Sequence, residues 1–306
     1  MKKFSPIVLF VYNRPWHTRQ TVEALLANEL ANESDLIIFA DGAKSDKDID
    51  AVKEVRKYIH SITGFKSITI NEQDMNLGLA NSVIAGVTKV VNEFGRIIVL
   101  EDDMVTSPYF LRYMNDALEM YENEDKVISI HGYIFPVRDQ LPETFFLRGA
   151  ECWGWATWKR GWDLFESNGQ KLLEELKRKN LQYLVDRNGL FPYTKMLKDQ
   201  IKGKIDSWAI RWYISAFIKE KTTLYPGRSL VINVGLDGSG RHIVTNSTEY
   251  NVVLTETRIE LIKQDVKESK ESLGVICKYL KGIKKSILKR ALEKVRYEYK
   301  KLRAKQ

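Results

Sequence analysis

An α/β fold is predicted, with a mostly parallel open sheet and helices on its flanks. In the first hundred residues, short runs rich in β-branched residues alternate with longer segments whose apolar residues recur every three or four positions. Three of the short runs are apolar almost throughout, which is typical of parallel strands covered on both faces. The alternation indicates repeated strand–helix–strand units, and therefore one open sheet.

The predicted elements follow in order along the chain. Strands are expected at Ile7–Tyr12, Leu36–Ala40, Ser67–Asn71 and Ile97–Leu100. Helical spacing predicts helices at His17–Asn28, Asp48–His60 and Leu79–Phe94. A further helix is expected to start near Thr106-Ser107-Pro108, with the serine as its cap and the proline in its first turn. In the second half, a helix is expected at Ser207–Ile218 and a strand at Ser229–Val234.

Composition places the chain among folded globular proteins. Of its 306 residues, 44% are hydrophobic and 29% are charged, which excludes a disordered chain, a collagen-like repeat and a coiled-coil rod. The two cysteines, Cys152 and Cys277, provide neither a disulfide framework nor a zinc cluster, so a reducing compartment is expected. The first apolar run is too short for a signal peptide or a membrane span, which predicts a cytoplasmic location.

Positive charge is concentrated at one end of the chain. The formal net charge is +8, yet residues 274–306 alone hold twelve lysines and arginines against two glutamates, so the remainder is close to neutral. Apolar residues recur every three or four positions from Ile276 to Leu302, which predicts a basic amphipathic helix. Such a helix could lie on an anionic membrane surface, or pack on the protein's own body or on a partner. No nucleic-acid-binding surface is expected outside this stretch.

Polar residues stand at the carboxyl ends of three predicted strands, which is where ligands bind in open α/β sheets. They are Asn13-Arg14-Pro15, Asp41-Gly42 and Glu101-Asp102-Asp103. Three adjacent carboxylates repel one another, and they are tolerated where Mg²⁺ or Mn²⁺ binds one or two of them together with water and substrate phosphates. The alternative is that the acids face solvent or cap the next helix, although that helix has a serine of its own.

These motifs resemble those of nucleotide-sugar glycosyltransferases with the GT-A fold, whose first half closes on an Asp-x-Asp-type metal motif. The likeness to bacterial family 2-type sugar transferases, and to the Golgi N-acetylglucosaminyltransferase that initiates complex N-glycans, lies in the Glu-Asp-Asp variant, Val11-Tyr12-Asn13-Arg14-Pro15, Phe39-Ala40-Asp41-Gly42 and Asn76-Leu77-Gly78-Leu79-Ala80. The resemblance extends to about Val244. It implies a Rossmann-like nucleotide-binding half at residues 1–125 and an acceptor half at residues 126–255. The basic amphipathic pattern adds a helical tail at residues 256–306.

The resemblance also implies roles for the residues at the strand ends. Asp103 is the implied ligand of Mn²⁺ or Mg²⁺, while Asp102 and Glu101 contact the ribose and the sugar of a UDP-sugar donor. Arg14 and Asp41 recognise the base. The residues alone allow simpler readings, because Arg14 could pair with a surface carboxylate and Asp41 belongs to a common turn dipeptide.

Four of the seven tryptophans lie within ten positions, in Cys152-Trp153-Gly154-Trp155-Ala156-Thr157-Trp158 and at Trp162. Indole rings stack on the apolar faces of sugars and donate hydrogen bonds, so this stretch suits sugar or acceptor binding. Trp158 and Trp162 are four residues apart and are assigned to packing. Trp153, Gly154 and Trp155 are assigned to the substrate site.

Asp206 stands at the start of the predicted helix Ser207–Ile218, where the resembled family has an acid that deprotonates the acceptor hydroxyl. It is therefore the expected catalytic base, with Trp208 as a further substrate residue. A carboxylate at a helix start is also favoured by the helix dipole, so a cap is the alternative. If Asp206 is not the base, Glu151 and Asp163 are the next candidates.

The glycine-rich stretch at residues 234–242 contains Ser239, Arg241 and His242. It resembles a family segment that orders over the bound donor, where these side chains would contact phosphates. A surface hairpin is the alternative.

The sequence thus predicts a metal-dependent, inverting glycosyltransferase. It would move a sugar from a UDP-sugar to a hydroxyl of a glycan or lipid-linked acceptor, at the inner face of the membrane and in cell-surface polysaccharide synthesis. A nucleotidyltransferase that makes nucleotide sugars is one alternative, although no glycine-rich loop follows the first strand. A non-enzymatic protein that binds an anionic polymer is another, and the near-neutral body disfavours it.

Overall fold

A computed structural model of the protein describes residues 4–237 and 248–285. Its strands are β1 (Ile7–Val11), β2 (Asp35–Ala40), β3 (Ser67–Glu72), β4 (Arg96–Glu101), β5 (Met104–Thr106), β6 (Val127–His131), β7 (Thr144–Arg148), β8 (Trp155–Trp158), β9 (Thr222–Pro226) and β10 (Val231–Asn233). Its α-helices are α1 (Pro15–Leu26), α2 (Ile49–Ile59), α3 (Leu79–Phe94), α4 (Phe110–Met120), α5 (Lys159–Trp162), α6 (Gly169–Arg178), α7 (Gln182–Val185), α8 (Tyr193–Ile201), α9 (Trp208–Ile218) and a helix described over residues 270–285.

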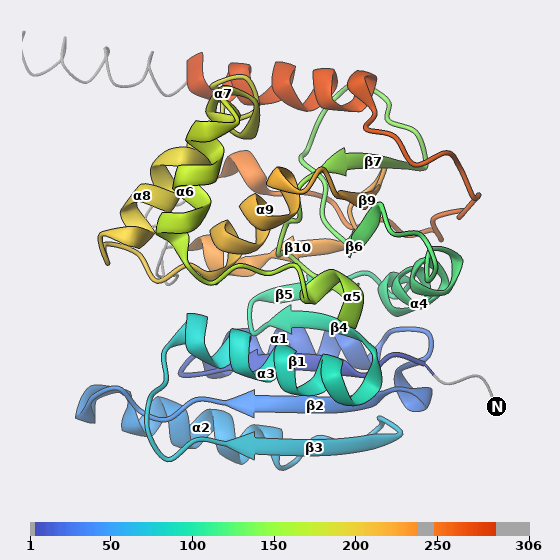
Figure 1. Ribbon diagram of the computed structural model, residues 1–306. Coiled ribbons are helices and arrows are strands. Elements are labelled where there is room, and N and C mark those ends of the chain that lie inside the picture. The colour runs from blue at the N-terminus through green and yellow to red at the C-terminus, as the bar shows by residue number, and fades with distance from the viewer. Residues whose placement is uncertain (1–3, 238–247, 286–306) are drawn as a thin grey trace, which may run out of the picture.

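The centre of the molecule is an eight-stranded sheet in the order β3-β2-β1-β4-β8-β6-β9-β7, with helices on its flanks (Figure 1). β1 pairs in parallel with β2 and β4, β2 with β3, and β6 with β9. β8 and β7 run against their neighbours. The predicted α/β fold with a mostly parallel sheet is therefore confirmed. A separate two-stranded sheet pairs β10 with β5.

Side chains of β1 alternate between the two faces of the sheet. Ile7, Leu9 and Val11 point into one core cluster, which includes the apolar side of α1 and α2. Val8 and Phe10 point into another, which includes Val83, Val87 and Val90 of α3. Because β1 is buried on both faces, its sequence is apolar throughout, as the prediction required.

The predicted elements of the first half are present, and α3 begins and ends at the predicted residues. One detail is wrong, because the N-cap of α4 is Tyr109 and not Ser107. The hydroxyl of Ser107 accepts from the amide of Tyr109 at 3.3 Å and donates to the carbonyl of Thr255 at 2.8 Å. The amide of Leu111 at the start of α4 donates instead to the side chain of Asn28, at 2.9 Å.

β8 joins the two halves of the chain into one sheet. Ala156 lies opposite Ile98 of β4 on one side and opposite Ile130 of β6 on the other. The strands of the second half are therefore continuous with those of the first. As a result, residues of both halves meet at the carboxyl ends of β1 and β4.

The helix at residues 270–285 packs on the body of the protein, next to β7 (Figure 1). Ile276 and Leu280 are buried against Phe145 and Leu147 of β7. Of the two predictions for the basic stretch, packing on the protein's own body holds for these residues, while residues 286–306 lie outside the described part. In the described chain, no helix combines the length and the apolar character that crossing a bilayer requires.

Candidate active site

A cavity of about 300 Å³ opens at the carboxyl ends of β1 and β4. Arg14 follows β1, Asp103 follows β4, Trp153 precedes β8 and Asp206 precedes α9, and all four line this cavity. The topology thus brings the predicted strand-end residues together with the tryptophan-rich stretch and the predicted base. The volume is at the lower end of the range for small-molecule sites, about 300–1,000 Å³.

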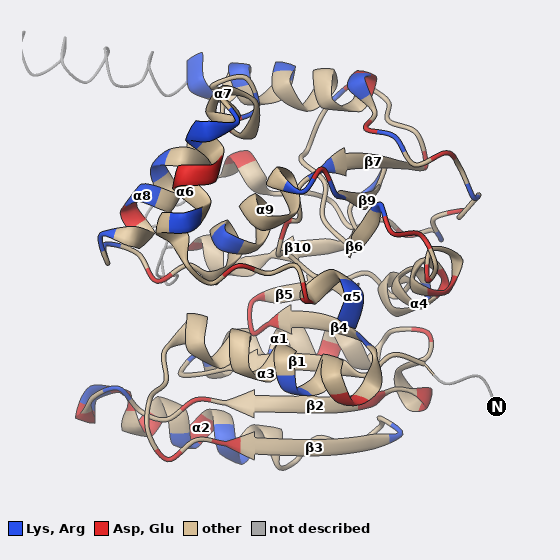
Figure 2. Cartoon of the chain, in the orientation of Figure 1, with Lys and Arg blue, Asp and Glu red and all other residues tan. Residues whose placement is uncertain are grey.

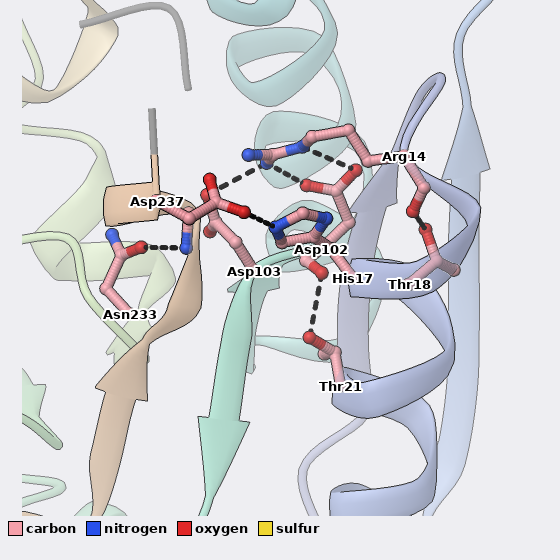
Figure 3. Close-up of polar contacts among 9 residues, drawn as sticks. Arg14, His17, Thr18, Thr21, Asp102, Asp103, Asn233 and Asp237 are labelled. Carbon is pink, nitrogen blue, oxygen red and sulfur yellow. Dashed lines mark hydrogen bonds and ion pairs between the residues drawn. The ribbon is translucent and has the colours of Figure 1, made fainter. Parts of the chain in front are cut away.

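Acidic residues gather at the turn between β4 and β5 (Figure 2), and Arg14 lies against them (Figure 3). Its Nη2 contacts Oδ1 of Asp102 and lies 2.8 Å from Oδ2 of Asp103. Both carboxylates are buried, with 4% and 8% of each residue exposed. Arg14 therefore offsets the repulsion between two adjacent buried acids, and it pairs with the motif rather than with a surface carboxylate.

Burial and mutual repulsion perturb the pKa values of this group. Burial, followed by the charges of Asp103 and Asp102, raises the pKa of Glu101 to about 8. Burial also raises the pKa of Asp102, although Arg14 acts in the opposite direction. Burial acts to lower the pKa of Arg14, but the two aspartates outweigh it and raise that pKa overall. Perturbed carboxyl groups in a cavity are typical of a functional site.

The segment after β10 covers the acidic turn. The amide of Val234 donates to the carbonyl of Asp103 at 2.9 Å, and the amide of Gly235 donates to the side chain of Asn233 at 2.9 Å. A Cβ on Gly235 would lie 2.2 Å from Oδ2 of Asp103 and 2.9 Å from Nη1 of Arg14. Only glycine lets the backbone approach the acids this closely.

Asp103 has the chemistry of a single-carboxylate metal ligand. Its Oδ1 is buried and accepts no hydrogen bond from any group in the described residues. Such an orphaned anionic oxygen is costly unless something else satisfies it. In residues 4–237 and 248–285, no three His, Cys, Asp or Glu side chains are arranged to hold a metal ion between them. The site therefore fits an ion such as Mg²⁺ or Mn²⁺, which takes one or two carboxylates and completes its shell with water and phosphates.

Asp41 lines the cavity, but its carboxylate is already committed to the neighbouring loop. Oδ1 accepts from the amides of Gly42 and Leu77, and Oδ2 accepts from the amide of Gly78 and the side chain of Asn76, all within 3.0 Å. A carboxylate offers about four lone-pair sites, so all are used. Asp41 therefore orders residues 76–78 from the cavity wall, and the contact with the base that the resemblance implies stays a prediction.

Asp206 is not the cap of α9. The hydroxyl of Ser207 accepts from the amide of Ile210 at 3.3 Å and caps the helix. The carboxylate of Asp206 is exposed and lines the cavity, and its Oδ2 accepts one long hydrogen bond from the amide of Ala80, at 3.4 Å. The capping alternative is therefore wrong, and the carboxylate is available to a substrate.

The two other candidate bases are committed elsewhere. Asp163 pairs with Lys159 at 2.7 Å on the protein surface. Glu151 pairs with the buried guanidinium of Arg187 at 2.9 Å. Neither residue lines the cavity that holds Asp103 and Asp206.

Of the two tryptophans assigned to the substrate site from the tryptophan-rich stretch, only Trp153 lines the cavity. Trp153 is half-buried in the cavity wall, whereas Trp155 is fully buried and packs against Trp208 and Trp212 in the core. The assignment of Trp155 to the substrate site is therefore wrong, because β8 directs its ring into the core between the sheet and α9. Trp208 reaches the cavity and donates a side-chain hydrogen bond to Glu101.

Gly154 is also absent from the cavity wall. Its φ is +62°, and a Cβ there would lie 2.6 Å from the side chain of Val231. The glycine is required for close packing rather than for substrate contact, which corrects its assignment. Trp158 and Trp162 are buried, with 4% and 5% exposed, as predicted for packing residues.

A contact between His17 and Asp237 escaped the sequence analysis. Nε2 of His17 on α1 lies 3.1 Å from Oδ2 of Asp237 (Figure 3). The available signal was the position of His17 in the first turn of the predicted helix, three residues after Arg14, which directs its side chain to the end of the first strand. The predicted phosphate contacts Ser239, Arg241 and His242 lie outside the described residues.

Comparisons with known proteins bear on the class of protein. The family model described as glycosyl transferase family 2 matches residues 7–185. Similar solved structures include S. aureus TarS, with a TM-score of 0.42 and 10% identity over 76% of this chain and 61% of that one. A mannosyltransferase from Pyrobaculum calidifontis, in complex with GDP-Man and Mn²⁺, has a TM-score of 0.36 and 11% identity over 56% and 47%. No curated protein sequence matches the chain.

A UDP-glucose pyrophosphorylase complexed with UDP-glucose has a TM-score of 0.33 and 12% identity over 73% of this chain and 90% of that one. The chain spans less than two thirds of the length of TarS and of the mannosyltransferase.

The sheet and its flanking helices define an α/β fold, and the family model gives the class of the protein as a glycosyl transferase. The match covers more than half of the chain, so the chain belongs to glycosyl transferase family 2.

Proposed function

We propose that the protein transfers a sugar from a nucleoside diphosphate sugar to a hydroxyl of a glycan or lipid-linked acceptor, with inversion at the anomeric carbon. One observation carries this proposal: a single cavity contains both Asp103, with its orphaned buried oxygen, and the exposed carboxylate of Asp206. The two carboxylates suit two different tasks, which are charge placement beside a diphosphate and proton removal from an acceptor.

Asp103 would hold Mn²⁺ or Mg²⁺, and the ion, when bound, supplies positive charge beside the diphosphate. Arg14 keeps Asp102 and Asp103 in place through its ion pairs. Glu101 and Asp102 stand beside Asp103, where the resemblance places contacts to the sugar and ribose. Uridine is the nucleotide that the resemblance favours.

Asp206 takes the proton of the acceptor hydroxyl as that oxygen attacks the anomeric carbon. The new bond to the acceptor oxygen forms while the bond to the diphosphate oxygen breaks, and the leaving diphosphate carries away the electron pair. Attack from the opposite side inverts the configuration. Trp153 in the cavity wall offers an indole surface on which the acceptor sugar can stack.

A screen of nucleotide sugars with Mn²⁺ tests this proposal. Slow hydrolysis of one donor in the absence of acceptor is expected, with release of the nucleoside diphosphate. Release of pyrophosphate from a nucleoside triphosphate and a sugar phosphate would instead indicate nucleotidyl transfer. If no nucleotide sugar is bound or hydrolysed, with or without metal, the enzymatic proposal is wrong.

The setting of the reaction is also part of the proposal. A cytoplasmic enzyme on the inner face of a membrane, in cell-surface polysaccharide synthesis, fits a lipid-linked acceptor and the basic residues of 274–306. The transferred sugar would be a hexose or an N-acetylhexosamine.

A further inference from the structure

A second cavity, of about 390 Å³, lies in the acceptor half. It is lined by the segment 134–143 between β6 and β7, by residues 227–229 after β9, and by Val252 and Val253. No residue of the donor cavity is among its lining residues. Its volume falls within the range of small-molecule sites, so it is large enough for a ligand of its own.

Aromatic rings connect the two cavities. Trp153 belongs to the wall of the first cavity, and its ring centroid is 4.7 Å from that of Tyr133 and 6.1 Å from that of Tyr250. Phe135 belongs to the wall of the second cavity, 5.7 Å from Tyr133 and 6.1 Å from Tyr250. Tyr279 lies 6.2 Å beyond Phe135. We call these five residues the aromatic track.

Most of the track is within reach of solvent. Tyr133 is buried, with 3% exposed, whereas Trp153, Phe135, Tyr250 and Tyr279 are all half-buried. A cluster that only filled the core would bury its rings completely, as Trp155 and Trp212 do. The half-buried rings therefore present apolar surface to a ligand that lies across them.

Hydrogen bonds fix the backbone that carries the track. The hydroxyl of Tyr133 donates to the carbonyl of Tyr250 at 2.9 Å. The hydroxyl of Tyr279 donates to the carbonyl of Glu249. Tyr250 is thus held in place before any ligand arrives, which lowers the entropic cost of binding.

Charged and polar groups surround the second cavity. Arg228 and Glu143 form an ion pair at 2.9 Å, and each side chain is 47% exposed. Asp139 pairs with Lys278 at 2.9 Å, and Gln140 is exposed. Exposed donors and acceptors beside aromatic rings suit a sugar, which has apolar C–H faces and a rim of hydroxyls.

We propose that the aromatic track and the second cavity bind an acceptor glycan of several sugar units. The terminal sugar would lie against Trp153 beside the donor, and the preceding units would lie along Tyr250 and Phe135 into the second cavity. This inference rests on the proposed function, because it names the acceptor class of that same site. It predicts that affinity rises with the length of the oligosaccharide.

Binding of oligosaccharides to the full chain tests the inference, without donor. The probes are chito-, cello- and malto-oligosaccharides of increasing length, measured by saturation-transfer NMR and calorimetry. We expect at least one series to bind about tenfold more tightly as a tetramer than as a monomer. A length-independent response in all three series would overturn the inference.

Three variants locate the binding. Val253 is 88% exposed in the wall of the second cavity, so Val253→Trp should obstruct the cavity without affecting folding. Phe135→Ala interrupts the track. Both should weaken tetramer binding about tenfold and leave monomer binding unchanged. Tyr183→Ala, at an aromatic residue that is 65% exposed outside both cavities, is the matched control and should bind as the wild type does.

Two further measurements separate the alternatives. If dodecyl maltoside binds more tightly than maltotriose and Val253→Trp abolishes that difference, the cavity holds an alkyl chain and the glycan inference is wrong. UDP is titrated into the same preparation. Binding of UDP without any oligosaccharide response contradicts only this inference, whereas oligosaccharide binding without binding of any nucleotide sugar contradicts the proposed function.

Discussion

At the scale of single residues, the decisive property of each carboxylate is how many hydrogen bonds the protein already gives it. Asp41 accepts four, and Asp102 is held by Arg14. Asp103 has one oxygen without a partner in the described chain, and Asp206 accepts a single long bond. Of these four carboxylates, Asp103 and Asp206 are therefore the two that have oxygen atoms left to contact a ligand.

Asp206→Asn should lower the transfer rate by about 10²–10⁴-fold and leave donor affinity unchanged, because a general base acts only in the transition state. Ser207 caps α9, so the melting temperature should also stay the same. Steady-state kinetics and calorimetry with the donor check both expectations. Asp163→Asn, at a surface acid paired with Lys159, is the matched control. Normal turnover by Asp206→Asn would exclude it as the base.

The tryptophan-rich stretch illustrates what residue types alone can predict. The clustering of tryptophans and their tendency to stack on sugars single out this segment, and Trp153 does line the cavity. The sequence could not decide between Trp153 and Trp155, because they flank a glycine with φ of +62° that redirects the chain. Only the register of β8, with Trp155 opposite Val99, places the second ring in the core.

At the scale of elements, the pairing of β10 with β5 places Val234 and Gly235 over the acidic turn between β4 and β5. Asn233 lies opposite Met104, so the chain after β10 passes directly over Asp103. The strand itself was predicted at Ser229–Val234, from its apolar β-branched residues. Its partner was not predicted, since β5 has only three residues and follows the acids immediately.

Gly235→Ala should weaken nucleotide binding about tenfold or more. The added Cβ would meet Oδ2 of Asp103 at 2.2 Å, and overpacking of this kind costs about 1–3 kcal/mol unless the segment moves away from the acids. Calorimetric titration with UDP and Mn²⁺ measures the effect. Gly274→Ala is the matched control, because a Cβ added at Gly274 would meet no atom of the described residues within 4 Å. Unchanged UDP affinity in Gly235→Ala would contradict the covering role.

The basic stretch shows the limit of amphipathic patterns. Ile276, Leu280 and Ile283 of the predicted stripe do pack on the body, but a stripe does not specify what covers it. In the structure, β7 and β9 provide the surface through Phe145 and Tyr225. That surface is assembled from strands distant in the sequence, so the sequence pattern could not identify it.

At the scale of the whole molecule, one eight-stranded sheet runs through both halves of the described chain. The parallel strands of the first half were predictable because β1, β2 and β4 are nearly continuous apolar runs, and β3 alternates apolar and polar residues as an edge strand does. The strand order of the second half was not, because β8 inserts between β4 and β6 before β9 and β7 complete the sheet. Which residues line the cavity was therefore easier to predict than which residues they contact. The pairing of Arg14 with Asp103, and of Gly78 with Asp41, depends on how the strands are arranged in the fold.

Stability should fall in acid because of His131 at the end of β6. Burial, and then the charge of Arg187, lowers the pKa of His131 from 6.5 to about 3. Between these two pH values the unfolded chain binds a proton that the folded chain does not, so the free energy of unfolding decreases as the pH falls. A shift of one pKa unit corresponds to about 1.4 kcal/mol.

Urea unfolding of the wild type and of His131→Phe, at pH 7 and pH 5, measures this contribution. The wild type should lose about 2 kcal/mol more than the variant over that interval. Equal losses in the two proteins would show that His131 does not carry the pH dependence.

The central claim is that Asp103 supplies the charge that makes nucleotide binding metal-dependent. The most direct measurement is the affinity for UDP, with and without Mn²⁺, in the wild type and in Asp103→Asn. We predict that Mn²⁺ strengthens binding to the wild type about tenfold or more, and that it has no effect on the variant, whose amide keeps the shape but loses the charge. Full Mn²⁺ enhancement in Asp103→Asn, or none in the wild type, would contradict the claim.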